Sequence, residues 1–517
     1  MSQQDVSDKS DVDCREIDLN TIEVSKPRSV GKEHVSLESL RFLGLDKKLS
    51  ELGFNGPQTA AAIGTIVGRA CEPGSELATH GWLRERSALG ELIDYDYDKL
   101  SLYGLYQISD QLLGKKSDIE QYLYEREHTL FGLQETITLY DLTNTYFEGQ
   151  SKGNGYAAHG HSKEKRSDCP LVTLGLVLDS SGFSRRSHVY EGNVNEPKTL
   201  SEMIHDLELG GNHREQKPTV VMDAGIATED NITWLQQHQY PYLVVSRKKH
   251  REFDEASAII VKKDEEYTVR AQKVFDEATG EVLLYCHSSR REQKDQAITD
   301  RFVRRFEEDL QKLASGLDKK RCLKKYDKVM IKIGRLKEKY SRVSRQYTIS
   351  VEKDDKSGNA RRITWQRQPA ADTTDSYPGV YCLRTSQTDW DESRLWSTYT
   401  MLTDLEAVFR SLKSELGLRP IHHQISKRVA GHLFITVLAY HLVHAIRFRL
   451  KQAGIHSSWS NLRKTLSTQS RVTVTMQCKN GQTVHVRKST RPEVEQQKIY
   501  TALGLKSHPG HTIKTTF

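Results

Sequence analysis

ETITLYDLT (residues 135–143) alternates apolar and polar side chains, which is the pattern of a β-strand with one buried face. LVTLGLVLD (171–179) follows as a nearly continuous apolar run, and Ser180-Ser181-Gly182 then turns the chain into FSRRSHVY (183–190). Three strands that succeed one another this closely are expected to pair as an antiparallel meander.

Two more buried strands are expected downstream, in PTVVMDAG (218–225) and YPYLVVS (240–246), with helices at about 196–209 and 228–238. The order is three strands, helix, strand, helix, strand. A meander followed by α/β crossovers predicts the mixed sheet of a ribonuclease H-like α/β domain.

The flanking sequence suggests further parts, separated by Gly and Pro punctuation and by changes in apolar spacing. We expect a flexible tail (1–35), a helical domain (36–130), the first part of the sheet domain (131–246), a large α+β insertion with a helical hairpin (247–385), a long helix followed by a core helix (386–452), and a basic C-terminal region (453–517). In the last of these, Asn480-Gly481 predicts a hairpin with a type I′ turn.

The charge is distributed unevenly along the chain. The net charge of the 517 residues is +7, but residues 417–517 hold 16 Lys and Arg against two acidic residues, or +14, so the rest carries 7 − 14 = −7. A basic C-terminal fifth suggests a polyanionic partner such as nucleic acid, and the alternative is a solvated basic face.

The cysteines and the apolar segments indicate in which cellular compartment the protein is expected. None of the seven cysteines forms a CxxC pair, which argues against a disulfide framework or a zinc ribbon and fits a reducing cytoplasm. The N-terminus lacks the apolar stretch of a signal peptide, and Leu433–Ile446 is too short to cross a bilayer. We therefore expect a cytoplasmic protein without a membrane partner.

Two aspartates are placed where ligand sites form. Asp141 and Asp223 each stand at the expected end of a buried strand, and sites in α/β sheets lie beyond strand ends. Two carboxylates brought together repel one another unless a cation lies between them, and hard oxygen ligands suit Mg²⁺ or Mn²⁺. A pair of such ions can cleave a phosphodiester. The alternative for each residue is a turn or cap aspartate.

The long helix expected at 391–416 adds a third acid. Tyr399, Glu406 and Lys413 are spaced by seven residues and so share one helix face, with Arg410 on an adjoining stripe. An acid beside cations suits metal and DNA phosphate, and the alternative is an exposed helix with Glu-to-Arg support. Glu415 lies on the opposite side of the helix.

Five segments resemble the DDE transposases of bacterial insertion sequences, in the group with a tyrosine–arginine–glutamate–lysine signature. They are YDLTNTYFEG (140–149), HSKEKRSDCPLVTLGLVLD (161–179), YEGNVNE (190–196), VVMDAGIAT (220–228) and YTMLTDLEAVFRSLKSELGLRPIHH (399–423). The family's two aspartates fall on Asp141 and Asp223, and its signature falls on Tyr399, Leu402, Glu406 and Lys413. Leu402 departs from the pattern because the family has arginine there.

The resemblance implies Mg²⁺-dependent cleavage and strand transfer at the inverted-repeat ends of a mobile element. It implies that Asp141, Asp223 and Glu406 hold two metal ions, that the helical domain at 36–130 binds DNA, and that a homodimer assembles on double-stranded DNA near the bacterial nucleoid. The alternatives are a nuclease of the same fold that does not join strands, and a catalytically idle DNA-binding protein.

The Gly-rich segment GNGYAAHG (153–160) does not match the pattern of a phosphate-binding loop, so no nucleotide cofactor is expected. His159 and His161 fit a solvated loop better than a metal site, and His422 and His423 are expected to cap or pack. Lys163, Lys165 and Arg166 are candidate DNA contacts near Asp141.

Overall fold

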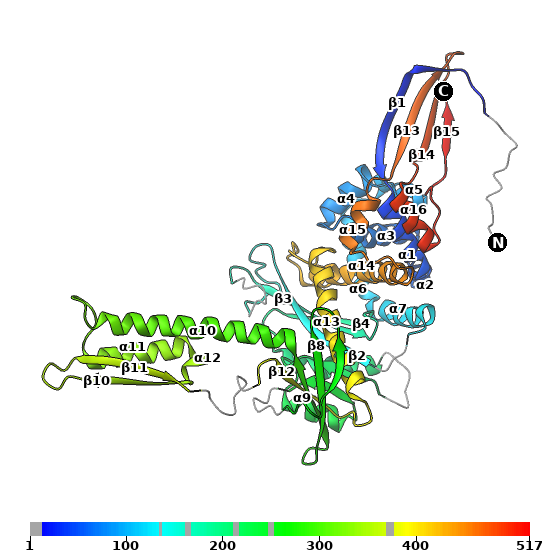
Figure 1. Cartoon of the computed structure of the whole chain (residues 1–517). Coiled ribbons are helices and arrows are strands. Elements are labelled where there is room, and N and C mark those ends of the chain that lie inside the picture. The colour runs from blue at the N-terminus through cyan, green and yellow to red at the C-terminus, as the bar shows by residue number, and fades with distance from the viewer. Residues whose placement is uncertain (1–12, 134–136, 161–166, 210–216, 247–252, 369–376) are drawn as a thin grey trace. The chain divides into compact units, whose positions relative to one another are not determined.

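The computed structural model describes residues 13–133, 137–160, 167–209, 217–246, 253–368 and 377–517 (Figure 1). Contacts divide the chain into two compact units. The first unit comprises Met1–Glu215 with Thr403–Phe517, and the second comprises Gln216–Leu402. Each unit is described by itself below.

Helices dominate the N-terminal part of the first unit. Asn55 opens α3 with a capping box that Gln58 completes, and Pro57 lies in the first turn, where no backbone donor is needed. The helices are α1 (Gly31–Phe42), α2 (Leu45–Glu51), α3 (Gly56–Cys71), α4 (Glu76–Glu85), α5 (Leu89–Ile93), η1 (Tyr97–Lys99), α6 (Leu102–Gly114) and α7 (Lys116–Phe131).

These helices share one core with a helix from the other end of the sequence. Helix α14 (Ser426–Gln452) contributes Phe434, Ile435, Leu438, Leu442 and Ala445 to the cluster that α1, α3 and α6 build. By length and composition α14 could cross a membrane, but 94% of its most apolar window is buried inside the fold. The segment at 36–130 is therefore not a core of its own, because α14 completes it.

A four-stranded antiparallel sheet, ordered β1-β13-β14-β15, also belongs to the first unit. Its strands are β1 (Ile17–Ser29), β13 (Ser470–Cys478), β14 (Thr483–Ser489) and β15 (Ile513–Thr516), and two helices, α15 (Trp459–Leu466) and α16 (Val494–Leu503), flank them in sequence. The prediction of a flexible tail over 1–35 is wrong for 17–29. Nearly every β1 side chain is exposed, so backbone pairing with β13, and not a buried face, holds the strand.

The hairpin between β13 and β14 forms as predicted, but its turn is of another type. The Gly481 amide donates to the Cys478 carbonyl over 2.9 Å, and Gly481 has φ +84°. Pairing of Cys478 with Gln482 leaves three residues in the loop, so a type I turn closed by a left-handed glycine replaces the expected type I′ turn.

The predicted meander is confirmed within the first unit. Strands β2 (Ile137–Tyr146), β3 (Leu171–Asp179) and β4 (Ser184–Glu191) pair antiparallel in the order β4-β3-β2. β3 is buried along its whole length, which explains its uninterrupted apolar sequence. The helix expected at 196–209 is present as η2 (Glu196–Thr199) and α8 (Leu200–Leu209).

The second unit contains six strands of a mixed sheet, in the order β5-β6-β12-β9-β8-β7. Its strands are β5 (Thr219–Met222), β6 (Tyr242–Val245), β7 (Ile259–Lys263), β8 (Thr268–Asp276), β9 (Glu281–Ser288) and β12 (Val380–Thr385), with α9 (Glu229–Gln237) between β5 and β6. β5 and β6 are parallel and the other pairs antiparallel. An insertion spanning all of 247–385 is therefore wrong, because β7, β8, β9 and β12 extend the sheet itself.

Residues 289–367 form a lobe beyond that sheet, which we call the arm (Figure 1). It holds the predicted helical hairpin, α10 (Ser289–Gly316) and α11 (Tyr326–Lys339), with the short α12 (Ser341–Ser344) and the hairpin β10 (Tyr347–Lys353) and β11 (Ala360–Arg367). Two small apolar clusters, centred on Phe306 with Leu310 and on Val329 with Ile333, fill the space between them.

Candidate active site

The first predicted acid lies inside a strand and not at its end. β2 continues past Asp141 to Tyr146, because the residues at 142–145 are buried and paired with β3. Only Asp141 and Tyr146 of its ten residues are not fully buried, so Asp141 is the point within the strand that solvent reaches. Its Oδ1 accepts a bond from the Leu142 amide over 2.7 Å.

The second predicted acid directly follows β5, as expected. The Oδ1 atom of Asp223 accepts bonds from the amides of Gly225 (2.8 Å) and Ile226 (3.1 Å), which is the bonding of an Asx turn. The residue is exposed, and Oδ2 accepts no hydrogen bond from the part of the chain that the structure describes. One carboxylate oxygen therefore fixes the turn and the other faces outward.

A hollow adjoins the loop that follows Asp223. It is lined by Ala227, Glu229, Ile232, Val244, Val245, Ser246 and Arg384. Arg384 is its cation, but Glu229 binds it with both oxygens (2.7 and 2.9 Å) and Glu281 also contacts it. The guanidinium is already neutralised there, so this hollow does not offer a free cation to a phosphate.

The third predicted acid lies on helix α13 (Glu392–Ser414), close to the helix predicted at 391–416. Glu406 is exposed, and its carboxylate has no hydrogen bond or ion pair with any residue that the structure describes. Glu415 differs, because it accepts bonds from the Ser411 hydroxyl (2.6 Å) and the Ser460 amide (2.9 Å). Glu406 is thus the acid that is open to a ligand.

The segment after α13 joins the end of β2 within the first unit. The Ile421 amide donates to the Tyr146 carbonyl (3.0 Å), the Glu148 amide donates to the Ile421 carbonyl (2.8 Å), and Phe147 and Ile421 form a parallel bridge. The strand of Asp141 and the end of the helix of Glu406 are therefore fastened to one another. Asp223 belongs to the second unit.

The predicted DNA contacts differ in their surroundings. Arg410 is exposed and forms no ion pair within the described ranges, whereas Lys413 is half-buried. Tyr399 is also half-buried, with its ring centroid 5.8 Å from that of Tyr381. Lys163, Lys165, Arg166 and His161 lie outside the described residues, and His159 is exposed.

The sequence analysis missed a buried charged cluster in the first unit. The cluster consists of Glu76 on α4, His423 just before α14, and His432 on α14. Their possible ligand atoms lie within 4.8 Å of one another, and no other group of three does so among the described residues. Oε2 of Glu76 lies 2.9 Å from Nε2 of His423, off the direction of a good hydrogen bond. Asp141 and Glu406 are not part of such a group.

Arg69 decides what this cluster can do. Its Nη2 lies 3.2 Å from Nδ1 of His432, and a guanidinium only donates, so Nδ1 accepts and the ring proton is on Nε2. A protonated nitrogen cannot bind a metal ion. Nη1 of Arg69 also donates to the Gly417 carbonyl (3.3 Å), so the cluster fastens the chain just after α13.

Comparison with known proteins gives two findings. A family model described as a transposase DDE domain matches residues 132–442. Among solved structures, the cryo-EM structure of a piggyBac transposase synaptic complex with hairpin DNA is similar, with 9% identity and a TM-score of 0.36 over 80% of this chain and 70% of that chain. No curated protein matches significantly.

Proposed function

Because the family model covers well over half of its residues, the chain belongs to the transposase DDE domain family, and we propose that it cleaves and joins DNA at the inverted-repeat ends of an insertion sequence. The observation that supports this proposal is that each of the three candidate acids can be reached from solvent. Asp141 is the solvent-reached position of a buried strand, Asp223 has one oxygen facing outward, and Glu406 is exposed and unpaired among described residues.

The donor chemistry fits the metal that such an enzyme uses. All three candidate ligands are carboxylates, and hard oxygen ligands suit Mg²⁺ or Mn²⁺. We propose that Asp141, Asp223 and Glu406 hold two divalent ions, which when bound would activate the attacking hydroxyl and stabilise the leaving oxygen. The catalytic domain would be ribonuclease H-like, as the order β2-β3-β4, helix, β5-α9-β6 suggests.

The residues around these acids have supporting roles. The Asx turn at Asp223 fixes the direction of its carboxylate, so the outward oxygen is oriented before a ligand arrives. Arg410, exposed and unpaired within the described ranges one helical turn beyond Glu406, is placed to bind a DNA phosphate and could replace the family's missing arginine at Leu402. Lys413 and Tyr399 offer less of their surface to DNA than Arg410 does, because both are half-buried.

The test uses the purified full chain with Mg²⁺ and a duplex carrying the inverted repeats that flank its gene. Asp141→Asn, Asp223→Asn and Glu406→Gln should each lower cleavage at least about 100-fold, because each removes one charged ligand from a preorganised electrostatic site. Asp230→Asn is the control, since Asp230 is an exposed acid in the first turn of α9 and should have no effect. Full activity of Asp223→Asn would refute the assignment.

A second substrate separates the proposal from a nuclease of the same fold. Pre-cleaved ends with a free 3′-hydroxyl should be joined to a target duplex, with no covalent link to the protein. Hydrolysis without joined products would indicate a nuclease, and end binding without either reaction would indicate an idle DNA-binding protein. We also propose that a homodimer holds two ends, and sedimentation of the DNA complex tests its stoichiometry.

A further inference from the structure

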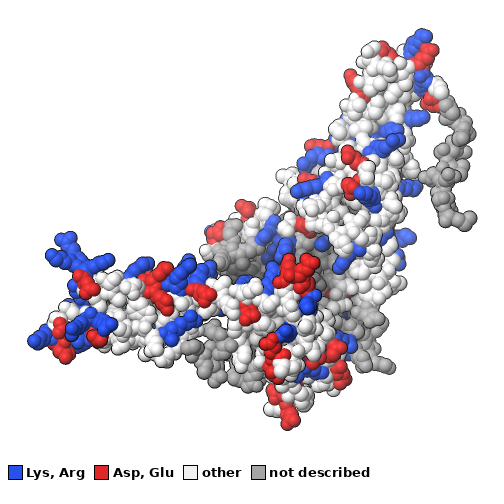
Figure 2. Space-filling model, in the orientation of Figure 1, with Lys and Arg blue, Asp and Glu red and all other residues white. Residues whose placement is uncertain are grey.

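The arm carries a positive charge that the proposed active site does not explain. Residues 289–367 contain 24 Lys and Arg and 12 Asp and Glu, a net charge of 24 − 12 = +12, although the whole chain carries only +7. Residues 319–335 alone hold eight basic residues and one acid, Asp327. Figure 2 shows Lys and Arg gathered toward the outer end of the arm.

Helix α11 arranges part of this charge in a line. Lys328, Lys332 and Arg335 follow one another at spacings of four and three residues, so they lie on one helix face. The apolar side chains that pack into the arm, Val329, Ile333 and Leu336, lie about 100° around the helix. The cations therefore face solvent, and all three are exposed.

The loop before α11 continues the line. Lys319, Lys320, Arg321 and Lys325 are exposed, and the backbone holds this loop against the β10–β11 turn. The Ala360 amide donates to the Lys324 carbonyl over 2.8 Å, and Lys325 and Asn359 form an antiparallel bridge. We call these four residues with Lys328, Lys332 and Arg335 the basic arm surface.

Local acids do not neutralise this surface. In the described part of the chain none of its seven cations forms an ion pair within 4.0 Å, whereas other cations of the arm do. Arg304 lies 4.0 Å from Glu308, and Lys312 lies 3.7 Å from Asp309. The cations of the basic arm surface thus differ from Arg304 and Lys312 on α10 and from Lys339 at the end of α11, each of which lies within 4.0 Å of an acid.

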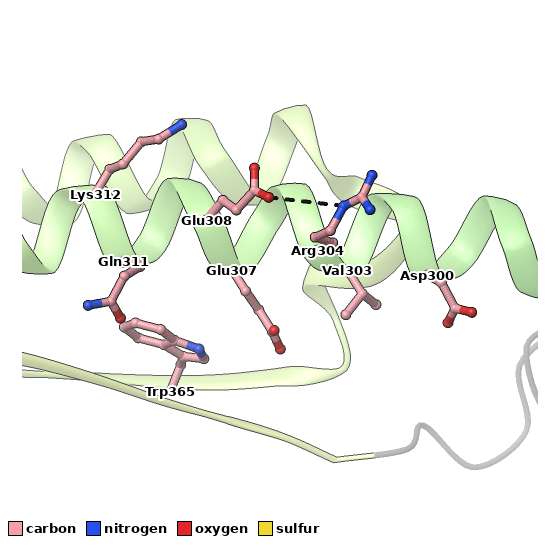
Figure 3. A pocket seen from close by; sticks show the side chains of 8 residues that line it. All are labelled: Asp300, Val303, Arg304, Glu307, Glu308, Gln311, Lys312 and Trp365. Atoms are coloured by element: carbon pink, nitrogen blue, oxygen red, sulfur yellow. Dashed lines mark ion pairs between the residues drawn. The ribbon is translucent and has the colours of Figure 1, made fainter.

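The hollow on the arm has the opposite character and marks the limit of that surface. Figure 3 shows Trp365 of β11 facing α10, with Glu307 and Asp300 on the same side and Arg304 paired with Glu308. The lining contains three acids and only two cations, Arg304 and Lys312, so its net charge is negative. A polyanion is therefore expected to bind along α11 and not in the hollow.

We propose that the basic arm surface binds the phosphate backbone of duplex DNA. This inference rests on the proposed function, which supplies DNA as the partner. The three cations of α11 span about 10 Å along its axis, at 1.5 Å per residue, so they can meet successive backbone phosphates. Apart from Lys and Arg, the face offers no Asn or Gln to read base edges, so the contact would be independent of sequence.

The test compares two variants of the full chain that each lose two Lys and one Arg. The test variant is Lys328→Gln/Lys332→Gln/Arg335→Gln, and the control is Lys262→Gln/Lys312→Gln/Arg304→Gln, whose cations are paired with acids at 3.0, 3.7 and 4.0 Å. Binding to a fluorescent duplex is measured by anisotropy over a range of salt concentrations without divalent metal. One duplex carries the inverted repeat and the other an arbitrary sequence.

The salt dependence gives the decisive readout. Loss of three phosphate contacts should reduce the slope of log K, the binding constant, against log salt by about three. It should also weaken binding to both duplexes by the same factor. The control should keep the wild-type slope. An unchanged slope in the test variant overturns the inference, and so does weaker binding of the test variant to vesicles of anionic lipid with unchanged DNA binding.

Failure of this inference is distinguishable from failure of the proposed function. Wild-type protein that neither binds nor cleaves the inverted-repeat duplex would remove the proposed function itself. Wild-type protein that binds and cleaves, beside a test variant with an unaltered slope, would remove only the role of the arm. Circular dichroism of both variants checks that the fold tolerates glutamine at the five exposed helix positions and at Lys262, which is half-buried in strand β7.

Discussion

The strongest stability prediction concerns Glu76, whose replacement by glutamine should loosen the anchor behind helix α13. Glu76 is 3% exposed and faces His423 at 2.9 Å, and Arg69 is buried beside His432. Burial and the charge of Arg69 lower the pKa of His432 well below its usual value, so that ring stays neutral. Arg69, whose guanidinium is always protonated, supplies a positive charge near the Glu76 carboxylate, and the ring of His423 lies against that carboxylate.

The magnitude follows from the pKa of Glu76. Burial alone would raise this pKa, but the contact with His423 and the neighbouring charges outweigh burial and lower it from 4.5 to about 2. At about 1.4 kcal/mol per pKa unit, this corresponds to about 3 kcal/mol of stability above pH 4.5 that is lost as pH falls through 2. Breaking a buried ion pair from one side costs about 3–5 kcal/mol, in agreement.

Hydrogen exchange at neutral pH measures this effect locally, which matters because two compact units need not unfold together. Glu76→Gln should lower the opening free energy of the slowest amides in α3 and α14 by about 3 kcal/mol. Glu85→Gln, an exposed position at the end of the same helix, is the control. Protection in Glu76→Gln within about 0.5 kcal/mol of wild type would refute the pairing, since that is the range of ordinary surface changes.

Three further changes test other buried features of the first unit. Burial raises the pKa of Glu33 to about 7, so its contribution to stability falls as pH rises from 4.5 through 7. Glu33→Gln should remove this pH dependence and raise the free energy of unfolding by up to about 3 kcal/mol at pH 8, measured by urea titration. His441→Leu should cost about 3–5 kcal/mol, because Glu127 lies 2.7 Å away with both side chains 1% exposed; the double variant with Glu127→Leu should recover much of it, and a cycle without coupling would contradict the pair. Gly431→Ala should cost about 1–3 kcal/mol, because its Cβ would lie 2.2 Å from the Ser109 hydroxyl oxygen; Ser109→Ala should relieve part of that cost, and a stabilised Gly431→Ala would show that α6 can shift.

The sequence predicted those parts of the fold whose side chains carry a periodic pattern. β3 is buried on both faces, and its sequence is one nearly continuous apolar run. α14 is buried along most of its length, and its apolar sequence predicted a buried core helix. β1 was missed although Ile17, Leu19, Ile22 and Val24 alternate with polar residues, because the partner that holds it, β13, lies more than 440 residues away. β12 was placed in an insertion because its pairing with both β6 and β9 is set by non-local contacts that local spacing does not record.

The site was predictable to a similar extent. The strand before Asp223 and the helix of Glu406 follow from local pattern, and the structure places both as expected. The end of β2 did not follow, since Thr143, Asn144 and Thr145 are polar but buried beyond Asp141. The cluster of Arg69, Glu76, His423 and His432 joins residues more than 340 positions apart, so local spacing does not reveal it. The one available signal was a charged residue, Arg69, within an otherwise apolar helix, because a buried charge needs a partner.

The distribution of charge links the proposed chemistry to the proposed arm. Residues 417–517 carry +14 and residues 289–367 carry +12, so the remaining 337 residues carry 7 − 14 − 12 = −19. Asp141, Asp223 and Glu406 all belong to that acidic remainder, which by itself would repel a polyanion. Most of the DNA affinity should then come from the two basic segments, with Arg410 adding one phosphate contact beside the acids. If arm and C-terminal region share the phosphate contacts, neutralising either one should lower the salt slope without abolishing binding, whereas neutralising both should abolish it at physiological salt.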